Sequence, residues 1–428
     1  MLVTNSESLY IDGPCQISGE VVISKAKNAI LPVLASTVMI DSPVVINQVP
    51  AIIDVATMVT LLSQMGVDIT VYEDLSLEVN ANNLYRLVAP HDLVRSMRAS
   101  CLVLGPMLTR FGYAEVAMPG GCAIGARPID LHLDGFRQMG ADVSFRNGSV
   151  VLRKSGRLQA AEINLKQVTV TGTENLMMAA VLAEGQTIIN NAAKEPEVVD
   201  LSIFLNSLGA NINGAGTSQI VIDGVDKLSS GSHNVLFDRI EAGTYLIAAA
   251  ATRGSVKIKQ VVPSVLKVLI EKLEQAGAVV TIGPDWVHLD MQGRRPKAVD
   301  VTTAPYPGFP TDFQAQWSIL NAVADGEAEI TENIFDQRFM HIEQLRKMAA
   351  DIQVKGNKIM TKGKSFLECS EVFATDLRAS ACLIIAAMVA RGETVIHDIM
   401  HVDRGYELIE EKLINLGGKI RRKENISA

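Results

Sequence analysis

A cysteine set among glycines is the residue best placed to do chemistry in this chain of 428 residues. Cys122 lies in the stretch VAMPGGCAIGARPIDL, residues 116–131, and Arg127 follows five positions later. Glycines permit backbone angles that are closed to other residues, so the stretch predicts a mobile or tightly turned loop. A thiol on such a loop is accessible, and the guanidinium offers a planar fork for phosphate or carboxylate. The alternative is a surface turn with an incidental cysteine, since free cysteines are usually buried and inert.

Polar and charged residues also open six apolar segments that we expect to be helices. The starts of helices carry unsatisfied N–H groups and the positive end of the helix dipole, so acidic and hydroxyl residues there serve as ordinary caps. Lysine and arginine are disfavoured in a first turn unless an anion lies beside them, and their presence therefore indicates anion sites. If the helices run parallel within each domain, their starts face one interdomain cleft. The opening residues are Lys27, Asn28, Arg98, Thr173 to Asn175, Glu241, Asp312, Gln314, Asp376 and Arg378.

The elements that must position these residues repeat along the chain. A helix end, then Gly or Ala, then an alternating strand recurs as QMGVDITV, QMGADVSF, SLGANING, QAGAVVTI, KMAADIQV and NLGGKIRR, a period of roughly 70 residues. A second recurring phrase is a helix of small apolar residues, which predicts an interior position because it is apolar nearly all round. Alternation at Val21 and Ile23, and at Val279 and Thr281, predicts sheets with one face on a core.

Six repeats of this α/β kind would divide as three and three. The opening strands LYIDG and GEVVIS have no repeat of their own, and we expect them to complete the last one. One domain is then discontinuous, comprising residues 1–25 and 237–428, around a second domain of residues 26–236. A single continuous solenoid is the alternative, but terminal capping repeats are not evident.

Composition limits the classes of function. The length favours two domains or more, and 48% hydrophobic residues supply their cores. The net charge of −8 and the lack of a basic stripe speak against a nucleic-acid partner. Five scattered cysteines, isolated histidines and the lack of a P-loop or Rossmann fingerprint predict no disulfide framework, metal or cofactor. The sequence has neither a signal peptide nor an apolar run of roughly 20 residues, so we expect a cytoplasmic protein without a membrane span.

Taken whole, PGGCAIGARPIDLHL resembles the reactive loop of the UDP-N-acetylglucosamine 1-carboxyvinyltransferases, within the enolpyruvyl transferase family. The resemblance covers essentially the full chain in order, through AKNAILP, LVRSMRAS, AAKEPEVVDL, RPKAVDVTTAPYPGFPTD, RFMHIEQL, ATDLRAS and HVDRGYE. It implies two similar inside-out α/β barrel domains of three repeats each, with helices inside and sheets outside.

The resemblance also implies a reaction, the first committed step of peptidoglycan precursor synthesis. The enolpyruvyl group of phosphoenolpyruvate is added to the 3-hydroxyl of UDP-N-acetylglucosamine, and phosphate is then eliminated. Addition needs a proton donor for the methylene carbon and a base for the hydroxyl. By resemblance Cys122 is the general acid and forms an adduct with phosphoenolpyruvate, Asp312 is the base, and Lys27 and Arg404 assist.

Binding residues follow from the same resemblance. Phosphoenolpyruvate carries a phosphate and a carboxylate and so needs several cations; its expected contacts are Lys27, Asn28, Arg127, Arg338, Asp376, Arg378 and Arg404. The expected contacts of UDP-N-acetylglucosamine are Asn28, Arg98, Arg127, Pro128, Ile129, Asp130, Leu131, Lys166, Gln167, Val168, Thr169, Val170, Thr171, Asp312 and Ile334. Thr171 and Gly172 stand where other family members have a Gly–Ala pair, so roles within 166–171 stay open.

Two other functions remain to be weighed. The sister transferase that acts on shikimate 3-phosphate shares the six-repeat fold but lacks a reactive-cysteine loop of this kind. A catalytically silent paralogue could bind nucleotide sugars as a regulator. Retention of Cys122, Asp312 and the full set of cations argues against that loss of catalysis. The oligomeric state does not follow from the sequence.

Overall fold

The computed structural model describes residues 7–118 and 129–424. These residues form two compact α/β units. We call residues 7–24 with 237–424 the discontinuous unit, and residues 25–118 with 129–236 the inserted unit. The chain therefore crosses from one unit to the other after Ser24 and returns after Leu236.

The strands of the discontinuous unit form three sheets among the described residues. Their bounds are β1 Glu7–Gly13, β2 Ser18–Val22, β14 Ser255–Lys259, β15 Val279–Ile282, β16 Trp286–Asp290, β17 Val301–Thr302, β18 Glu327–Thr331, β19 Asp351–Lys355, β20 Lys358–Lys362, β21 Leu367–Glu368, β22 Glu371–Phe373, β23 Ala390–His397 and β24 Ile420–Glu424. The strand orders are β21–β23–β1–β24 with β22 also beside β23, β15–β16–β14–β2, and β17–β18–β20–β19.

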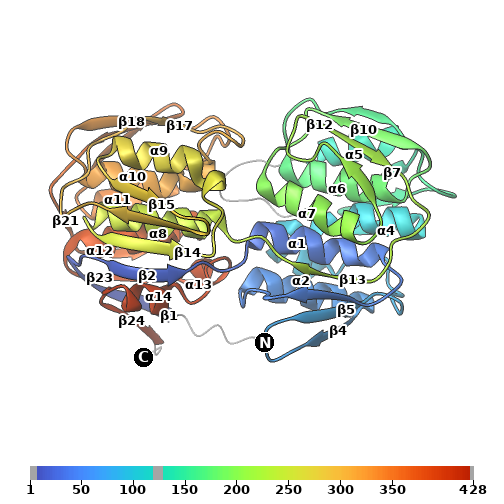
Figure 1. Cartoon of the computed structure of the whole chain (residues 1–428), viewed down its shortest axis with the longest axis horizontal. Coiled ribbons are helices and arrows are strands. Elements are labelled where there is room, and N and C mark those ends of the chain that lie inside the picture. The colour runs from blue at the N-terminus through green and yellow to red at the C-terminus, as the bar shows by residue number, and fades with distance from the viewer. Residues whose placement is uncertain (1–6, 119–128, 425–428) are drawn as a thin grey trace. The chain divides into compact units, whose positions relative to one another are not determined.

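The first strands of the chain complete sheets that are built mostly from later ones. β1 pairs antiparallel with β23 and β24, with Leu9 opposite Ile396 and Arg422. β2 pairs parallel with β14, and the blue strand beside the yellow one in Figure 1 shows this long-range partnership. The expectation that the opening strands complete the last repeat is confirmed for β1. It is wrong for β2, which joins the sheet of the fourth repeat.

The inserted unit also has three sheets in its described part. Its strands are β3 Val44–Asn47, β4 Asp68–Val71, β5 Leu77–Asn80, β6 Tyr113–Ala117, β7 Asp142–Arg146, β8 Ser149–Arg153, β9 Glu162–Asn164, β10 Gln186–Asn190, β11 Asn211–Asn213, β12 Gln219–Asp223 and β13 Gly231–Asn234. They are ordered β11–β12–β10–β9, β13–β3–β5–β4 and β6–β8–β7.

Helices that pack against one another fill the interior of each unit. In the discontinuous unit these are α8 Arg239–Ala251, α10 Gln314–Val323 and α12 Leu377–Val389. In the inserted unit they are α1 Lys27–Ser36, the 3₁₀ helix η2 Arg98–Val103 with α4 Leu104–Phe111, and α6 Val170–Val181. Every residue of α8 and α10 is buried, because small and apolar side chains can be covered on all sides. The prediction of interior helices from the second phrase is thus confirmed.

The second helix of each repeat ends where the first phrase predicts. These helices are α2 Ile53–Met65, α5 Asp130–Gln138, α7 Pro196–Ser207, α9 Lys267–Gln275, α11 Met340–Lys347 and α14 Ile409–Asn415, and each is followed by a strand. The shorter elements are α3 His91–Ser96, α13 Met400–Asp403, η1 Thr37–Met39, η3 Pro263–Leu266 and η4 Thr311–Phe313.

Local predictions failed at two places. Val279 is 44% exposed and β15 is an edge strand, so the alternation at Val279 and Thr281 does not mark a core face. Val21 and Ile23 are buried, as their alternation predicts. The third interior helix begins at Val170, three residues before the polar run at Thr173, because the Thr169 side chain accepts a hydrogen bond from Gly172 N and caps α6. None of the helices in the described ranges is both long and apolar enough to cross a membrane.

Candidate active site

The densest group of predicted site residues lies in the discontinuous unit, around Asp312. Arg338 Nη2 donates to Asp312 Oδ1 at 2.7 Å, and Arg378 Nε lies 3.4 Å from the same oxygen. The side chains of Arg338 and Arg378 are only 7% and 5% exposed, whereas that of Asp312 is 25% exposed. Three elements meet here, since Asp312 lies in η4, Arg338 precedes α11 and Arg378 lies in the first turn of α12. The structure therefore brings together three residues that are far apart in the sequence.

The two guanidinium groups determine the charge of this carboxyl group. Burial would raise the pKa of Asp312, but the cations of Arg378 and Arg338 overcome it and hold that pKa well below its usual range. Arg239, at the first position of α8, adds to the same effect. Asp312 is consequently an anion at neutral pH and does not act as the helix cap that its position before α10 suggested.

Tyr406 joins this cluster from beyond α13. Arg378 Nη1 donates to its hydroxyl oxygen at 3.1 Å, and Gln316 Nε2 donates to it at 3.3 Å. The hydroxyl also lies 3.0 Å from Thr244 Oγ1. With Arg378 held on one side by Asp312 and on the other by Tyr406, its guanidinium is fixed in direction before any ligand arrives.

Asp376 and Arg404 lie near this cluster without a direct contact to Asp312 among the described bonds. Asp376 caps α12, because its Oδ1 accepts from Arg378 N at 2.9 Å and from Ala379 N at 3.0 Å. Arg404 follows α13, which packs against α12. Burial and the cation of Arg404 lower the pKa of His401, and Asp376 opposes them, so both groups lie close to that ring.

Ile334 lies in the turn between β18 and α11. Its backbone N–H donates at 2.8 Å to Glu332 Oε1. The other carboxylate oxygen of Glu332 accepts from the Thr311 hydroxyl at 2.8 Å, directly beside Asp312 in sequence. The two predicted contacts of the nucleotide sugar in this unit are thus connected through one buried glutamate.

The inserted unit holds the other predicted residues, with fewer charge pairs between them. Lys27 and Asn28 open α1, and Lys27 Nζ lies 3.4 Å from Asp54 Oδ2 of α2. Arg98 is the first residue of η2 and is half-buried. Both cations stand in a first helical turn, where the dipole disfavours them unless an anion is bound. Their placement is as the sequence predicted.

A neutral network connects the starts of three helices in this unit. Asn175 Oδ1 accepts from Gly105 N at 2.7 Å, so its Nδ2 faces Cys101 O at 2.9 Å and His132 Nδ1 at 3.1 Å. The His132 Nδ1 must then accept, which leaves Nε2–H to face the Thr171 hydroxyl at 3.4 Å. Burial and the cation of Arg98 lower the pKa of His132 to about 4, in agreement with a neutral ring.

Besides Asn28 and Arg98, the described nucleotide residues predicted for this unit lie at the starts of α5 and α6, which pack together. Ile129 precedes α5, and Asp130 and Leu131 are its first residues. The other predicted residues lie just before α6 or in its first turn. They are Lys166, Gln167, Val168, Thr169, Val170 and Thr171. Lys166 is mostly exposed and lies 3.8 Å from Asp134 Oδ2 of α5.

Three buried glutamates form a cluster, of which the sequence analysis named only Glu174, among the polar residues that open the third interior helix. Glu174 of α6 is 1% exposed, and Glu195 and Glu197 at the start of α7 are 8% and 3% exposed. Burial, together with the negative charges of Glu197 and Glu195, raises the pKa of Glu174 well above its usual range. Burial and the neighbouring carboxylates thus favour the protonated form of Glu174.

Cys122, Arg127 and Pro128 lie outside the described residues, so the geometry of the predicted reactive loop is not part of this description. The other cysteines differ in character. Burial raises the pKa of the Cys101 thiol to about 11 and that of Cys382 well above its usual value. Cys15 is half-buried and Cys369 is exposed.

Some of the missed residues had a signal in the sequence. Arg239 is a buried arginine at the first position of an interior helix, and the rule that selected Arg98 would have selected it too. Tyr406 belongs to the HVDRGYE motif but was not singled out. Glu332 had no such signal, because only its three-dimensional neighbours distinguish it from a surface glutamate.

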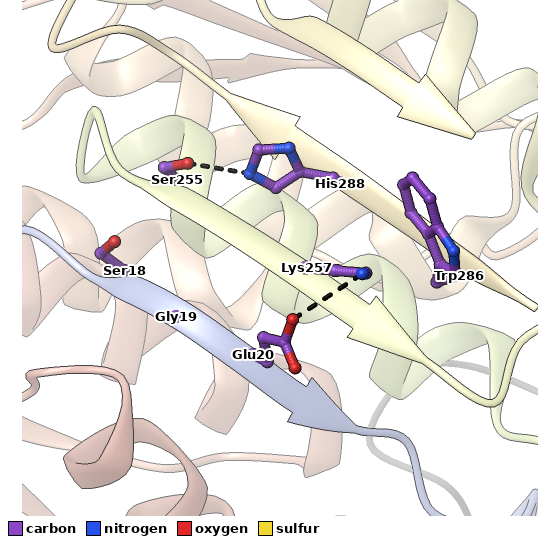
Figure 2. Close-up of a pocket in the computed structure, with 7 residues that line it drawn as sticks. All are labelled: Ser18, Gly19, Glu20, Ser255, Lys257, Trp286 and His288. Atoms are coloured by element: carbon purple, nitrogen blue, oxygen red, sulfur yellow. Dashed lines mark hydrogen bonds and ion pairs between the residues drawn. The ribbon is translucent and has the colours of Figure 1, made fainter. Parts of the chain in front are cut away.

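A surface pocket elsewhere contains none of the predicted residues. It lies on strands β2, β14 and β16 (Figure 2). Its volume is about 360 Å³. Ser255 Oγ lies 3.0 Å from His288 Nε2, and Lys257 lies over the Trp286 ring and 3.7 Å from Glu20. These groups satisfy one another across the outer face of the sheet. Within residues 7–118 and 129–424, no group of three or more His, Cys, Asp or Glu side chains is arranged to hold a metal ion.

Comparison with known proteins identifies relatives of the whole chain. The model of the EPSP synthase (3-phosphoshikimate 1-carboxyvinyltransferase) family matches residues 11–413. UDP-N-acetylglucosamine 1-carboxyvinyltransferases of Coxiella burnetii, strains Dugway 5J108-111 and RSA 493 / Nine Mile phase I, are each 57% identical over 97% of this chain and 96% of their own length.

Solved structures agree in fold. The enolpyruvyl transferase NikO from Streptomyces tendae matches with a TM-score of 0.88 and 24% identity, over 98% of this chain and 100% of its own. EPSP synthase from Acinetobacter baumannii matches with a TM-score of 0.73 and 17% identity, over 98% of this chain and 100% of its own. The chain therefore belongs to the enolpyruvyl transferase family and, within it, to the UDP-N-acetylglucosamine 1-carboxyvinyltransferases.

Proposed function

We propose that this protein transfers the enolpyruvyl group of phosphoenolpyruvate to the 3-hydroxyl of UDP-N-acetylglucosamine, with release of phosphate. The observation that carries the proposal is 57% identity, over 97% of the chain, to relatives named for that reaction. The reaction proceeds by addition and then elimination, and its product is a precursor of peptidoglycan.

The anionic Asp312 is the proposed base for the sugar hydroxyl. In the unliganded protein its two arginine neighbours make it a weak base, because they stabilise the charged form. The phosphate and carboxylate of phosphoenolpyruvate would neutralise part of that positive charge. Its pKa would then rise toward the range where proton transfer is efficient. Binding of one substrate would thus activate the base for the other.

The remaining roles follow from the resemblance to the family. Cys122 is the proposed general acid and the residue that forms the phosphoenolpyruvate adduct. The proposed contacts of phosphoenolpyruvate are Lys27, Asn28, Arg127, Arg338, Asp376, Arg378 and Arg404. Those of the nucleotide sugar are Asn28, Arg98, residues 127–131, residues 166–171, Asp312 and Ile334. Cations held in place before the reaction stabilise charge as it develops in the transition state.

The proposed architecture is two inside-out barrels of three repeats, comprising residues 1–25 with 237–428 and residues 26–236. Interior helices that contact one another and strands buried on one face support it. A cytoplasmic location is proposed because the substrates are soluble metabolites.

Phosphate release, measured with phosphoenolpyruvate and either UDP-N-acetylglucosamine or shikimate 3-phosphate, tests this function. We expect release only with the nucleotide sugar, together with a product whose mass has increased by one enolpyruvyl group. Release with shikimate 3-phosphate alone would indicate the sister activity. Binding of the nucleotide sugar without any release would indicate the regulatory paralogue.

A further inference from the structure

Glu332 is a buried carboxylate that accepts four hydrogen bonds immediately after β18. Only 2% of the residue is exposed. Its Oε1 accepts from Thr303 Oγ1 at 2.8 Å, from Ile334 N at 2.8 Å and from Phe335 N at 3.2 Å. Its Oε2 accepts from Thr311 Oγ1 at 2.8 Å. One side chain therefore joins the end of β18, the turn before α11 and the start of η4.

The direction of the Thr311 hydroxyl follows from its two neighbours. Arg338 Nη1, 3.0 Å away, can only donate to the hydroxyl oxygen, and the Glu332 carboxylate can only accept its proton. The same guanidinium donates from Nη2 to Asp312 Oδ1 at 2.7 Å. A continuous chain of hydrogen bonds thus runs from Glu332 through Thr311 and Arg338 to Asp312. Its bonds are charge-assisted, and each polarises the next.

The Glu332 carboxylate also holds the turn between β18 and α11. Two successive backbone N–H groups, of Ile334 and Phe335, point at one oxygen of Glu332. The Thr303 hydroxyl donates to that oxygen and accepts from Asn333 N at 2.9 Å, which connects the turn to the strand beside it. Without an acceptor at this position, two part-buried N–H groups would lose this partner and the turn would have to rearrange.

We propose that Glu332 is a positioning residue for the nucleotide-sugar site of the discontinuous unit. It sets the direction of the Asp312 carboxylate through Thr311 and Arg338, and it sets the backbone at Ile334 directly. Glu332 itself is buried and does not contact the substrate. The inference rests on the proposed function, because Asp312 and Ile334 are the residues assigned to UDP-N-acetylglucosamine there.

Glu332→Gln tests the proposal with little change of shape. The amide keeps one accepting oxygen but presents an NH₂ group to donors that the carboxylate had satisfied. We expect the Kd for UDP-N-acetylglucosamine, measured by calorimetry without phosphoenolpyruvate, to rise roughly 10- to 100-fold. We expect the KM for the same substrate to rise with it. Glu329→Gln is the matched control, because Glu329 lies three residues earlier on β18 and pairs with Lys358 at the surface.

Thr311 supplies a second test that does not depend on folding of the Glu332 variant. Thr311→Val removes the hydroxyl but keeps the branched shape, whereas Thr311→Ser keeps the hydroxyl. We expect the valine variant to lose affinity like Glu332→Gln and the serine variant to bind like the parent. Because the two residues act through one chain of bonds, the double variant should lose no more than the more affected single variant.

The outcomes separate the two proposals. In one outcome the parent and Glu329→Gln are active, and Glu332→Gln and Thr311→Val bind the nucleotide sugar like the parent. The positioning role is then wrong and the proposed function stands. A lower unfolding temperature with unchanged Kd and KM would show a purely structural role and would also overturn the inference. If the parent neither releases phosphate nor binds the nucleotide sugar, both proposals fall together.

Discussion

Two carboxyl groups, one in each unit, have pKa values that their surroundings shift in opposite directions. Asp312 lies between Arg338 and Arg378, and Glu174 lies near Glu195 and Glu197. Burial acts in the same direction on both and raises the pKa. At Asp312 the cations reverse that effect, whereas at Glu174 the neighbouring carboxylates add to it. The surroundings favour the anion at Asp312 and the neutral acid at Glu174.

The contrast extends to the surroundings of each carboxyl group. The discontinuous unit fixes charge by pairing it, through arginines that are aligned by Asp312, Thr311 and Tyr406. The inserted unit joins its helices through the neutral groups of His132 and Asn175. A charged cluster of this kind can respond to the charge of a ligand, while a neutral network mainly holds shape. The following experiments test this division, from the largest expected effect to the smallest.

Replacement of the proposed acid should have the largest effect. Cys122→Ser should lower the rate of phosphate release by roughly 10²- to 10⁴-fold, because an alcohol is a much weaker proton donor than a thiol. Cys122→Asp should retain measurable turnover, since a carboxyl group in a dry site can also deliver a proton. Rates are compared at saturating concentrations of both substrates. A serine variant that turns over like the parent would show that Cys122 is not the acid.

Asp312→Asn should come next, with an effect on both activity and stability. The amide removes the proposed base and leaves two buried guanidinium groups without their anion. We expect a loss of roughly 100-fold or more in kcat and about 2 kcal/mol in the free energy of unfolding. Single-turnover kinetics and urea unfolding measure the two effects. Parental activity in this variant would contradict the charged role assigned to the discontinuous unit.

Acidification should lower the free energy of unfolding, because it protonates His132 in the unfolded chain. Its pKa is about 4 in the folded protein and near 6.5 in the unfolded chain. Between these values the unfolded chain binds a proton that the folded state does not, so stability falls as the pH falls from 6.5 to 4. At pH 4 this difference in the pKa of His132 lowers the free energy of unfolding by about 3 kcal/mol. Burial also lowers the pKa of His341, in the discontinuous unit, to about 4, so both units contribute.

The histidine variants separate these two contributions. His132→Gln and His341→Gln should each lose less stability between pH 7 and pH 4.5 than the parent, as measured by urea unfolding. A parent and two variants with identical losses on acidification would refute the assignment of neutral buried rings.

The smallest effect is expected where the side chain is already neutral. Glu174→Gln replaces a carboxyl group whose raised pKa favours the neutral form by an amide of nearly the same shape. The free energy of unfolding at pH 7 should therefore change by no more than about 1 kcal/mol. Activity should be retained. The same exchange of acid for amide is severe at Asp312, which makes the pair a direct comparison. A large loss at Glu174 would mean that this group is ionised in the folded protein.

The repeats could be predicted from the sequence, because each repeat contains a helix end that depends on local residues. Gly66, Gly140, Gly209, Gly277 and Gly417 occupy the left-handed conformation after such ends, and Ala349 adopts it in the remaining copy. The charges of Asp312 and Glu174 could not be predicted, since they depend on residues distant in sequence. The same holds for Glu332, whose four partners come from three separate segments.

The pairing of β1 with β23 and β24 has a consequence for synthesis of the chain. The ribosome makes residues 7–13 before the inserted unit, but their partners, residues 392–396 and 420–424, are made after it. The inserted unit can form its own sheets once residue 234 has emerged, whereas β1 must wait without a partner. Such distant pairing slows folding and leaves strand edges exposed in the meantime. We therefore expect the inserted unit to fold before the discontinuous unit, although the discontinuous unit begins earlier in the chain.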